Sequence, residues 1–205
     1  MRVDRLKGLN GKELEGPLLI TPQVFGDNRG FFFESWNEQR FRDALVDAGT
    51  PVEEADALRF RQDNHSSSCK GVLRGLHYQL PPEPQGKLVR CSVGTIFDVA
   101  VDLRAHSSTY GLWVSAELSA SNQQQLWVPV GFAHGFLTLS DRAEVQYKAS
   151  GFWNRQCERS LSWADSSLNV AWPLDGIGVS TPLLAEKDAT APGLAELAAA
   201  GEVFA

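Results

Sequence analysis

A succession of short strand-like segments runs through most of this 205-residue chain and restricts the folds open to it. Many short strands joined at Gly or Pro are typical of a β-sandwich, jelly roll or barrel, and this length suits one such domain. We therefore expect a single all-β domain over residues 1–205. The expected strands lie at roughly 58–65, 71–79, 87–93, 95–104, 110–119, 124–130, 132–139, 143–151 and 158–163.

Helical patterns are confined to the flanks of this region. Phe41, Ala44, Leu45 and Ala48 recur at three- and four-residue spacing and predict a helix over 37–48, which Gly49-Thr50-Pro51 stops. The alanine-rich run over 192–200 predicts a second, short helix.

The predicted organisation has three parts. Short strands at 18–20 and 31–34, joined by a turn at 26–30, belong with the helix to an N-terminal part over residues 1–54. A core of β-strands follows at roughly 55–165, and a C-terminal segment covers 166–205.

Residues 61–79, RQDNHSSSCKGVLRGLHYQ, are unusually polar for two strands, here expected around a serine-rich turn. A buried polar group without a partner costs free energy, so such strands usually line a polar pocket. Strict alternation places Arg74 and His77 on opposite faces. Gly75 between them is a position where a bulge would re-aim one of the two.

Charge and cysteine content exclude several classes of protein. The net charge of -6 argues against a general nucleic-acid binder. Cys69, Cys91 and Cys157 are odd in number and form no CxxC pair, which indicates reduced thiols in a cytoplasmic protein. Because no signal-peptide segment and no apolar run of about 18 residues occurs, we expect no membrane association.

Three side chains suit acid–base chemistry, although each also has a purely structural interpretation. His77 is either a general base or a histidine satisfied by the backbone of its strand. Tyr147 is either a core aromatic or an acid acting on the face of a carbon opposite to the base, which would allow inversion. Lys87 either stabilises a developing oxyanion or is a solvated lysine at a strand end.

Metal and nucleotide-cofactor enzymes are disfavoured. His134 lies in an apolar strand, but a metal site would need further ligands, and the other histidines, His65 and His106, form no His-x-His or His-x₃₋₅-His spacing. There is no Gly-x-Ser-x-Gly, no phosphate-binding loop and no GxGxxG before a helix, which argues against serine hydrolases, P-loop enzymes and Rossmann oxidoreductases.

Several blocks, in order between about Asp27 and Asp188, resemble the dTDP-4-dehydrorhamnose 3,5-epimerase family. They are QDNHS at 62–66, GVLRGLHYQ at 71–79, QGKLVR at 85–90, DVAVDLR at 98–104, LWVP at 126–129, GFAHGF at 131–136, YK at 147–148 and EKD at 186–188. The resemblance implies a cupin-type double-stranded β-helix (jelly roll) with a few short peripheral helices. It also implies a homodimer and a cofactor-free, metal-free epimerase.

The family's activity converts dTDP-4-dehydro-6-deoxy-D-glucose to dTDP-4-dehydro-L-rhamnose. By motif matching, His77 is the base, Tyr147 the acid, Asp188 orients His77 and Lys87 stabilises the enolate oxygen. The positions that match holders of the nucleotide-sugar are Arg29, Glu34, Gln62, Asn64, Arg74, His134, Glu158 and Lys187. Of these, Arg29 and Glu34 are expected to come from the partner chain.

One departure from the family pattern leaves alternatives open. The family usually has a tyrosine pair after the Tyr-Lys strand, where this chain has Phe152-Trp153. A lost hydroxyl near the sugar would affect which carbon is epimerised, so an enzyme acting at C3 or C5 alone is an alternative. A cupin-type sugar ketoisomerase and a non-catalytic sugar-binding cupin are the others.

Overall fold

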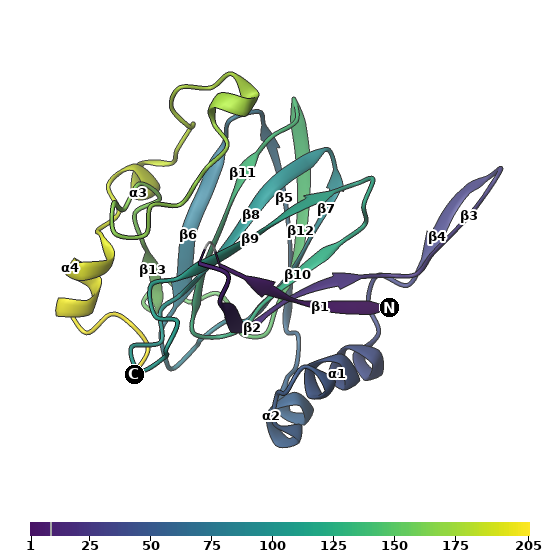
Figure 1. Cartoon of the computed structure of the whole chain (residues 1–205), viewed down its shortest axis with the longest axis horizontal. Coiled ribbons are helices and arrows are strands. Elements are labelled where there is room, and N and C mark those ends of the chain that lie inside the picture. The colour runs from purple at the N-terminus through teal and green to yellow at the C-terminus, as the bar shows by residue number, and fades with distance from the viewer. Residues whose placement is uncertain (9) are drawn as a thin grey trace.

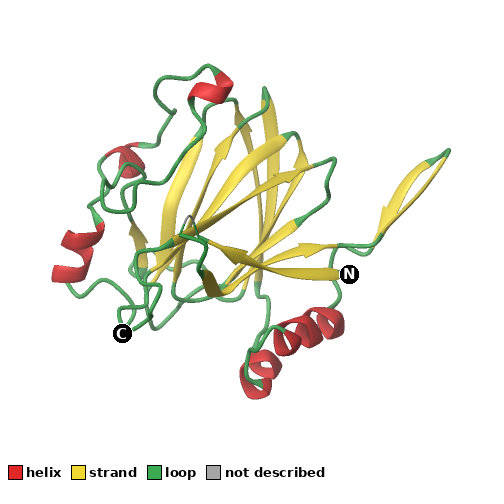
Figure 2. Cartoon of the chain, in the orientation of Figure 1, coloured by secondary structure: helices red, strands yellow, loops and turns green. Residues whose placement is uncertain are grey.

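A computed structural model, which describes residues 1–8 and 10–205, consists of two facing antiparallel sheets with a few short helices around them (Figure 2). The strand orders are β1-β2-β10-β7-β12-β5 and β13-β6-β11-β8-β9. This is the expected cupin-type jelly roll. None of the helices in the described ranges is long and apolar enough to cross a membrane.

The bounds of the elements follow the chain. The six-stranded sheet contains β1 (Arg2–Lys7), β2 (Glu13–Thr21), β5 (Gln62–Cys69), β7 (Lys87–Val93), β10 (Gln125–Val128) and β12 (Arg142–Ala149). The five-stranded sheet contains β6 (Leu73–Gln79), β8 (Thr95–Asp102), β9 (Trp113–Ser119), β11 (Phe132–Thr138) and β13 (Glu158–Ser160). The remaining elements are β3 (Val24–Asp27), β4 (Gly30–Phe33), α1 (Glu38–Asp47), α2 (Val52–Ala57), a 3₁₀ turn (Asp175–Ile177), α3 (Glu186–Ala189) and α4 (Leu194–Ala199).

The main core lies between the two sheets. Because side chains alternate along each strand, every second residue points inward. Val89 and Val145 from the six-stranded sheet meet Ile96, Ala100 and Phe136 from the five-stranded sheet in one buried cluster. These inward positions define the face from which the functional side chains also project.

The outer face of the five-stranded sheet is covered by the C-terminal segment, so both faces of this sheet are buried. Leu194 and Leu197 of α4 pack against Val99 and Val101 of β8. Tyr78 of β6 also donates a hydrogen bond to the carbonyl of Glu202 at 2.6 Å. Figure 1 shows α3 and α4 beside β6 and β13.

The outer face of the six-stranded sheet is covered in part by α1 and α2. The predicted helix over 37–48 is confirmed as α1, with the Asn37 side chain accepting from the N–H of Arg40 as its N-cap. Helix α2 was not predicted. Glu53 and Glu54 lie in its first turn, where their negative charges interact favourably with the positive end of the helix dipole and stabilise the helix. Ala55 is buried against the sheet.

The first core strand is shifted from its predicted position. Residues 58–65 were expected, whereas β5 spans Gln62–Cys69, so the serines lie in the strand and the predicted serine-rich turn is wrong. Leu58 and Phe60 instead pack with Phe41 of α1, outside the sheet pairing.

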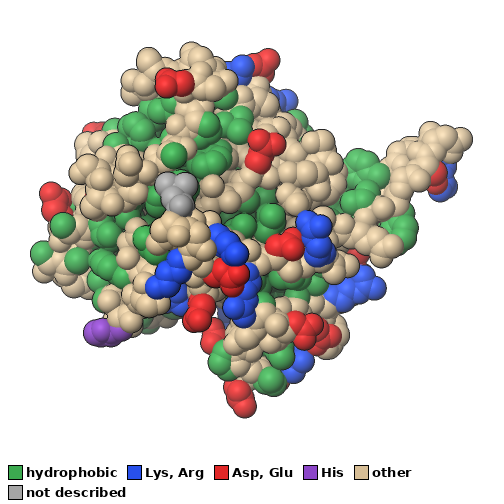
Figure 3. All heavy atoms as spheres, viewed as in Figure 1, with side chains coloured by type: hydrophobic (Ala, Val, Ile, Leu, Met, Phe, Trp, Pro, Cys, Tyr) green, Lys and Arg blue, Asp and Glu red, His purple; other side chains and the backbone are tan. Residues whose placement is uncertain are grey.

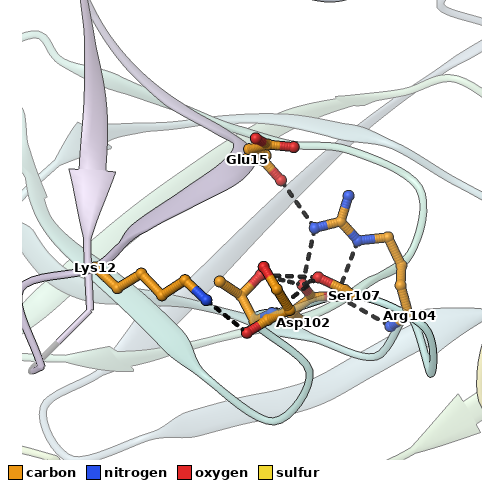
Figure 4. A network of polar contacts seen from close by, with 7 residues as sticks. Lys12, Glu15, Asp102, Arg104 and Ser107 are labelled. Atoms are coloured by element: carbon orange, nitrogen blue, oxygen red, sulfur yellow. Dashed lines mark hydrogen bonds and ion pairs between the residues drawn. The ribbon is translucent and has the colours of Figure 1, made fainter.

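A charged network closes the end of β8 (Figure 4). Asp102 is fully buried and accepts hydrogen bonds from Arg104, Ser107 and Thr109. Burial by itself would raise the pKa of Asp102, but these donors outweigh burial and lower it. Arg104 also donates to the carbonyl of Glu15 at 2.9 Å, which ties β2 to β8.

Strands β3 and β4 form a hairpin that projects away from both sheets (Figure 1). Four of its apolar side chains, Val24, Phe25, Phe31 and Phe32, are exposed, with Phe32 72% accessible. In Figure 3, hydrophobic side chains gather at the base of this projection, and a few charged side chains lie near its tip.

Candidate active site

Polar side chains from both sheets face one another across the interior. Strand register places them on the same inward faces as the core residues. The six-stranded sheet contributes Gln62 and Asn64 on β5, Tyr147 on β12 and Lys87 on β7. The five-stranded sheet contributes His77 on β6, His134 on β11 and Asp98 on β8.

His77 forms a close pair with Asp188. The His77 Nε2 atom lies 2.5 Å from Asp188 Oδ1, and the N–H of Gly75 donates to Asp188 Oδ2 at 3.4 Å. Asp188 comes from α3 and its side chain is only 3% exposed, whereas that of His77 is 22% exposed. When a carboxylate accepts a hydrogen bond from one nitrogen of a neutral imidazole, that nitrogen carries the proton. The lone pair is then on the other ring nitrogen, which for His77 is Nδ1.

A bulge in β6 puts Arg74 and His77 on the same face, as the glycine between them suggested. The register with β11 pairs His77 with His134 but Arg74 with Phe136, so one extra residue lies on β6. Gly75 has φ +126°, and a Cβ there would lie 2.6 Å from the Cα of Gly135. Only glycine permits this approach of the two strands.

Burial controls the protonation of His77 and Lys87. It lowers the pKa of His77, an effect that Asp188 opposes. It also lowers the pKa of Lys87 to about 8, against the opposing influence of Asp98 and Glu158. The Nζ atom of Lys87 crosses from the opposite sheet and donates to the carbonyl of His77 at 3.2 Å.

Tyr147 lies beside Lys87, whose Nζ is 6.0 Å from the centroid of the tyrosine ring. Burial, followed by the negative charge of Glu158, raises the pKa of Tyr147. The phenol therefore keeps its proton at neutral pH. Tyr147 belongs to the sheet opposite His77, so a phenol and an imidazole face each other across the interior.

His134 is buried and its Nε2 atom lies 2.7 Å from Oδ1 of Asp98. Asp98 was not among the predicted site residues. The available signal was a carboxylate on the inward face of an otherwise apolar strand, but the sequence does not say which histidine such a carboxylate would meet.

Glu158 links two parts of the chain beside the site. It receives a hydrogen bond from Lys187 of α3 at 3.0 Å. Burial opposes ionisation of Glu158, but Lys187 and the side chain of Trp153 outweigh burial and lower its pKa. The predicted residues Glu158 and Lys187 are thus brought close to Asp188.

The chain's unusual aromatic pair is exposed and is held by two glutamine side chains. Phe152 and Trp153 are each 55% accessible. The N–H of Trp153 donates to Gln62 Oε1 at 2.9 Å, and the carbonyl of Phe152 accepts from Gln79 at 3.1 Å. Gln62 also donates to Asn64, so two predicted ligand holders support this loop.

Arg29 and Glu34 do not join the other predicted residues within one chain. Arg29 lies in the turn between β3 and β4, where its side chain pairs with Asp27 at 2.5 Å. Glu34 follows β4 and pairs with Arg40 at 3.2 Å. By contrast, Arg74 reaches β5 and donates to Ser68 at 3.0 Å.

Within residues 1–8 and 10–205, no group of three or more His, Cys, Asp or Glu side chains is arranged to hold a metal ion. His65 on β5 lies on the outer face of the six-stranded sheet, and its Nε2 atom is 3.1 Å from Glu144 Oε2.

Comparison with known proteins identifies the family. The family model described as dTDP-4-dehydrorhamnose 3,5-epimerase matches residues 11–196. The chain belongs to this family. A dTDP-4-dehydrorhamnose 3,5-epimerase of Shigella flexneri is 54% identical over 176 residues, which cover 86% of this chain and 90% of the relative.

Solved structures agree with this assignment. A Legionella pneumophila dTDP-6-deoxy-D-glucose-3,5-epimerase in complex with dTDP-4-keto-L-rhamnose is 39% identical, with a TM-score of 0.85 over 99% of this chain and 98% of that chain. A 3'-monoepimerase from Streptomyces bikiniensis in complex with dTDP-quinovose is 31% identical, with a TM-score of 0.80 over 92% and 89%. These two structural relatives are thus named for different activities, one as a 3,5-epimerase and the other as a 3'-monoepimerase.

Proposed function

We propose that this protein epimerises dTDP-4-dehydro-6-deoxy-D-glucose at C3 and C5 to give dTDP-4-dehydro-L-rhamnose. The observation that carries the proposal is the His77–Asp188 pair at 2.5 Å, facing Lys87 and Tyr147 of the opposite sheet. The names of relatives up to 54% identical point to the same reaction.

The proposed chemistry needs only proton transfers. The C–H bonds beside the C4 ketone are acidic because the C4 oxygen takes the negative charge when a proton leaves. His77 removes that proton, and the ammonium of Lys87 stabilises the enolate oxygen. Tyr147 then donates a proton from the opposite face, so the carbon is inverted. One proton leaves and one returns, so no electron acceptor or cofactor takes part.

The remaining predicted residues hold the nucleotide-sugar. Arg74 and Lys187 are the cations suited to its diphosphate, and Glu158 keeps Lys187 near Asp188. Gln62, Asn64 and His134 offer neutral hydrogen-bonding groups from both sheets.

We further propose a homodimer in which Arg29 and Glu34 complete the site of the partner. The supporting observation is the exposed apolar hairpin, because an isolated two-stranded ribbon with exposed phenylalanines is marginally stable by itself. The three free cysteines, Cys69, Cys91 and Cys157, fit a cytoplasmic enzyme.

The decisive experiment is incubation with dTDP-4-dehydro-6-deoxy-D-glucose in D₂O, followed by NMR of the product. Deuterium at both C3 and C5 with inverted configuration is expected. Absence of deuterium at both C3 and C5 would refute the epimerase and leave a sugar-binding cupin. A product with its carbonyl moved to another carbon would identify a ketoisomerase.

A mono-epimerase is the second candidate. It is favoured by Phe152-Trp153 in place of the family's tyrosine pair and by the similarity to a 3'-monoepimerase. Deuterium with inversion at one carbon only would establish it. Phe152→Tyr and Trp153→Tyr should then restore reaction at the second carbon if the missing hydroxyl is the cause.

A further inference from the structure

Asp98 is a buried charge without an assigned role. Its side chain is fully buried on β8 between the two sheets. One oxygen, Oδ1, contacts His134, but Oδ2 has no hydrogen-bond partner in the described part of the chain. A buried carboxylate with an unpaired oxygen is costly unless a positive charge lies nearby.

Lys87 is a buried cation on the inward face of the opposite sheet. An ammonium group has three donors, and the one hydrogen bond found for Lys87 goes to the carbonyl of His77. Among the charges acting on Lys87, Asp98 favours the ammonium form most strongly and Glu158 comes second. Asp98 and Lys87 are thus a buried carboxyl group and a buried amine that project inward from the two facing sheets.

We propose that Asp98 is a positioning residue of this site, whose carboxylate keeps Lys87 in the ammonium form and holds the ring of His134 in one orientation. The inference rests on the proposed epimerisation, because only a charged Lys87 can stabilise the enolate oxygen. Asp98 acts through these two residues and contributes no proton to the sugar.

A purely structural role makes a different prediction. If Asp98 served only as the acceptor for His134, its removal would lower the rate by the same factor at every pH. A charge role produces a loss that grows with pH, because Lys87 then loses its proton earlier. The other ionisable groups around Lys87, which stay in place in the variants, are His77, His134, Tyr147, Glu158 and Lys187.

The test compares pH profiles of kcat for the wild type and Asp98→Asn. A fall of about one unit in the Lys87 pKa, from about 8, leaves roughly a tenth of the lysine charged at pH 8 instead of half. The ratio of variant to wild-type kcat should therefore drop about fivefold between pH 6 and pH 8. Asp98→Glu keeps the charge and should keep the wild-type profile, and Asp98→Ser serves as the neutral variant if Asn prevents folding.

A second readout does not depend on catalysis. The Cε resonance of Lys87 can be followed by NMR in ligand-free protein labelled with ¹³C-lysine and assigned by its loss in Lys87→Arg. The chemical shift of this resonance is measured as a function of pH. The midpoint of that titration should fall by about one pH unit in Asp98→Asn or Asp98→Ser and stay in place in Asp98→Glu. An unchanged midpoint overturns the proposal. A shifted midpoint in a protein that exchanges no deuterium would instead refute the epimerase while leaving the Asp98–Lys87 coupling intact.

Discussion

Individual residues between the sheets have pKa values shifted in the directions that proton transfer requires. Burial is the main cause at each of them: it lowers the pKa of His77 and Lys87 and raises that of Tyr147. A neutral imidazole, an ammonium and a protonated phenol therefore coexist at neutral pH.

Asp188→Asn should move the acid limb of kcat/KM to lower pH. His77 acts as a neutral base, so the rate falls as pH drops through its pKa, which burial already holds below 6.5. Without the Asp188 charge that pKa falls further. The plateau should also fall by about 10²-fold or more, because the ring loses its orienting partner. Glu144→Gln, which removes the carboxylate beside His65 on the outer face, is the control and should leave the profile unchanged. An acid limb that stays in place in Asp188→Asn would contradict the assignment.

Tyr147→Phe should separate the two proton transfers. His77 can still exchange a proton at the first carbon, but no acid remains on the opposite face, so deuterium should enter without net inversion. NMR of the recovered sugar measures both quantities. Tyr78→Phe, which removes a hydroxyl bonded to Glu202 on the outer face, should invert normally. Normal inversion by Tyr147→Phe would mean that another group is the acid.

Among the elements, β6 determines the geometry of the site. Its bulge aligns Arg74 and His77 on one face, while β11 packs directly against the glycine of the bulge. The short helix α3 then brings Asp188 against His77 from more than a hundred residues further along the chain.

Gly75→Ala should remove activity and destabilise the protein together. The added methyl group would lie 2.6 Å from Gly135 Cα and 2.8 Å from the carbonyl oxygen of His134, so β6 and β11 must separate. A displacement of about 1 Å is enough to cost about 10²-fold in rate. Gly176→Ala, where no atom lies within 4 Å of the new methyl group, is the matched control. Retention of wild-type kcat and Tm by Gly75→Ala would show that the bulge is not required.

The network at the end of β8 predicts a pH-dependent contribution to stability. Asp102→Asn should lower the free energy of unfolding by about 3–5 kcal/mol, because Arg104 loses its buried partner. The folded pKa of Asp102 lies below 3.8, so this contribution is complete above that value and is lost as pH falls through the lower pKa. Urea titrations of both proteins at pH 7 and below pH 3.8 measure the difference. Asp141→Asn, at an exposed ion pair, should change neither curve.

At the scale of the whole molecule, three buried clusters of the described residues hold the layers together, and none of them includes a residue of the β3–β4 hairpin. One cluster lies between the sheets, one lies under the C-terminal segment and one lies under α1. The exposed phenylalanines of the hairpin have no comparable cover within one chain, which is why we assign them to a partner chain.

Mixed dimers test whether Arg29 acts across subunits. Arg29→Ala and His77→Ala homodimers should each be nearly inactive. After random exchange of subunits in equal amounts, half of the dimers are mixed and each has one intact site, so about a quarter of wild-type activity should return. No recovery would place Arg29 and His77 in the same site of the same chain. His77→Ala mixed with Tyr147→Phe, whose residues share one chain's site, should show the same recovery only if that site also spans two chains.

The sequence by itself determined the fold class, the helices α1 and α4, and a set of acid–base candidates. Strand periodicity and turn residues are local signals. They indicate a sandwich, jelly roll or barrel and mark Gly75 as a position for a bulge, whereas the family resemblance specified the jelly roll. Local signals failed where packing decided the outcome: Leu58 and Phe60 pack on α1 outside the sheet pairing, and the serines of 66–68 lie in β5.

Only the tertiary structure decided which candidates meet. His77, Lys87 and Tyr147 come from three strands in two sheets, and Asp188 comes from the opposite end of the chain. Asp98 was missed because the partners of a buried carboxylate are set by the neighbouring strands and the facing sheet, about which local sequence says nothing. Periodicity tells which way a side chain points, whereas the distance between two side chains depends on how distant segments pack.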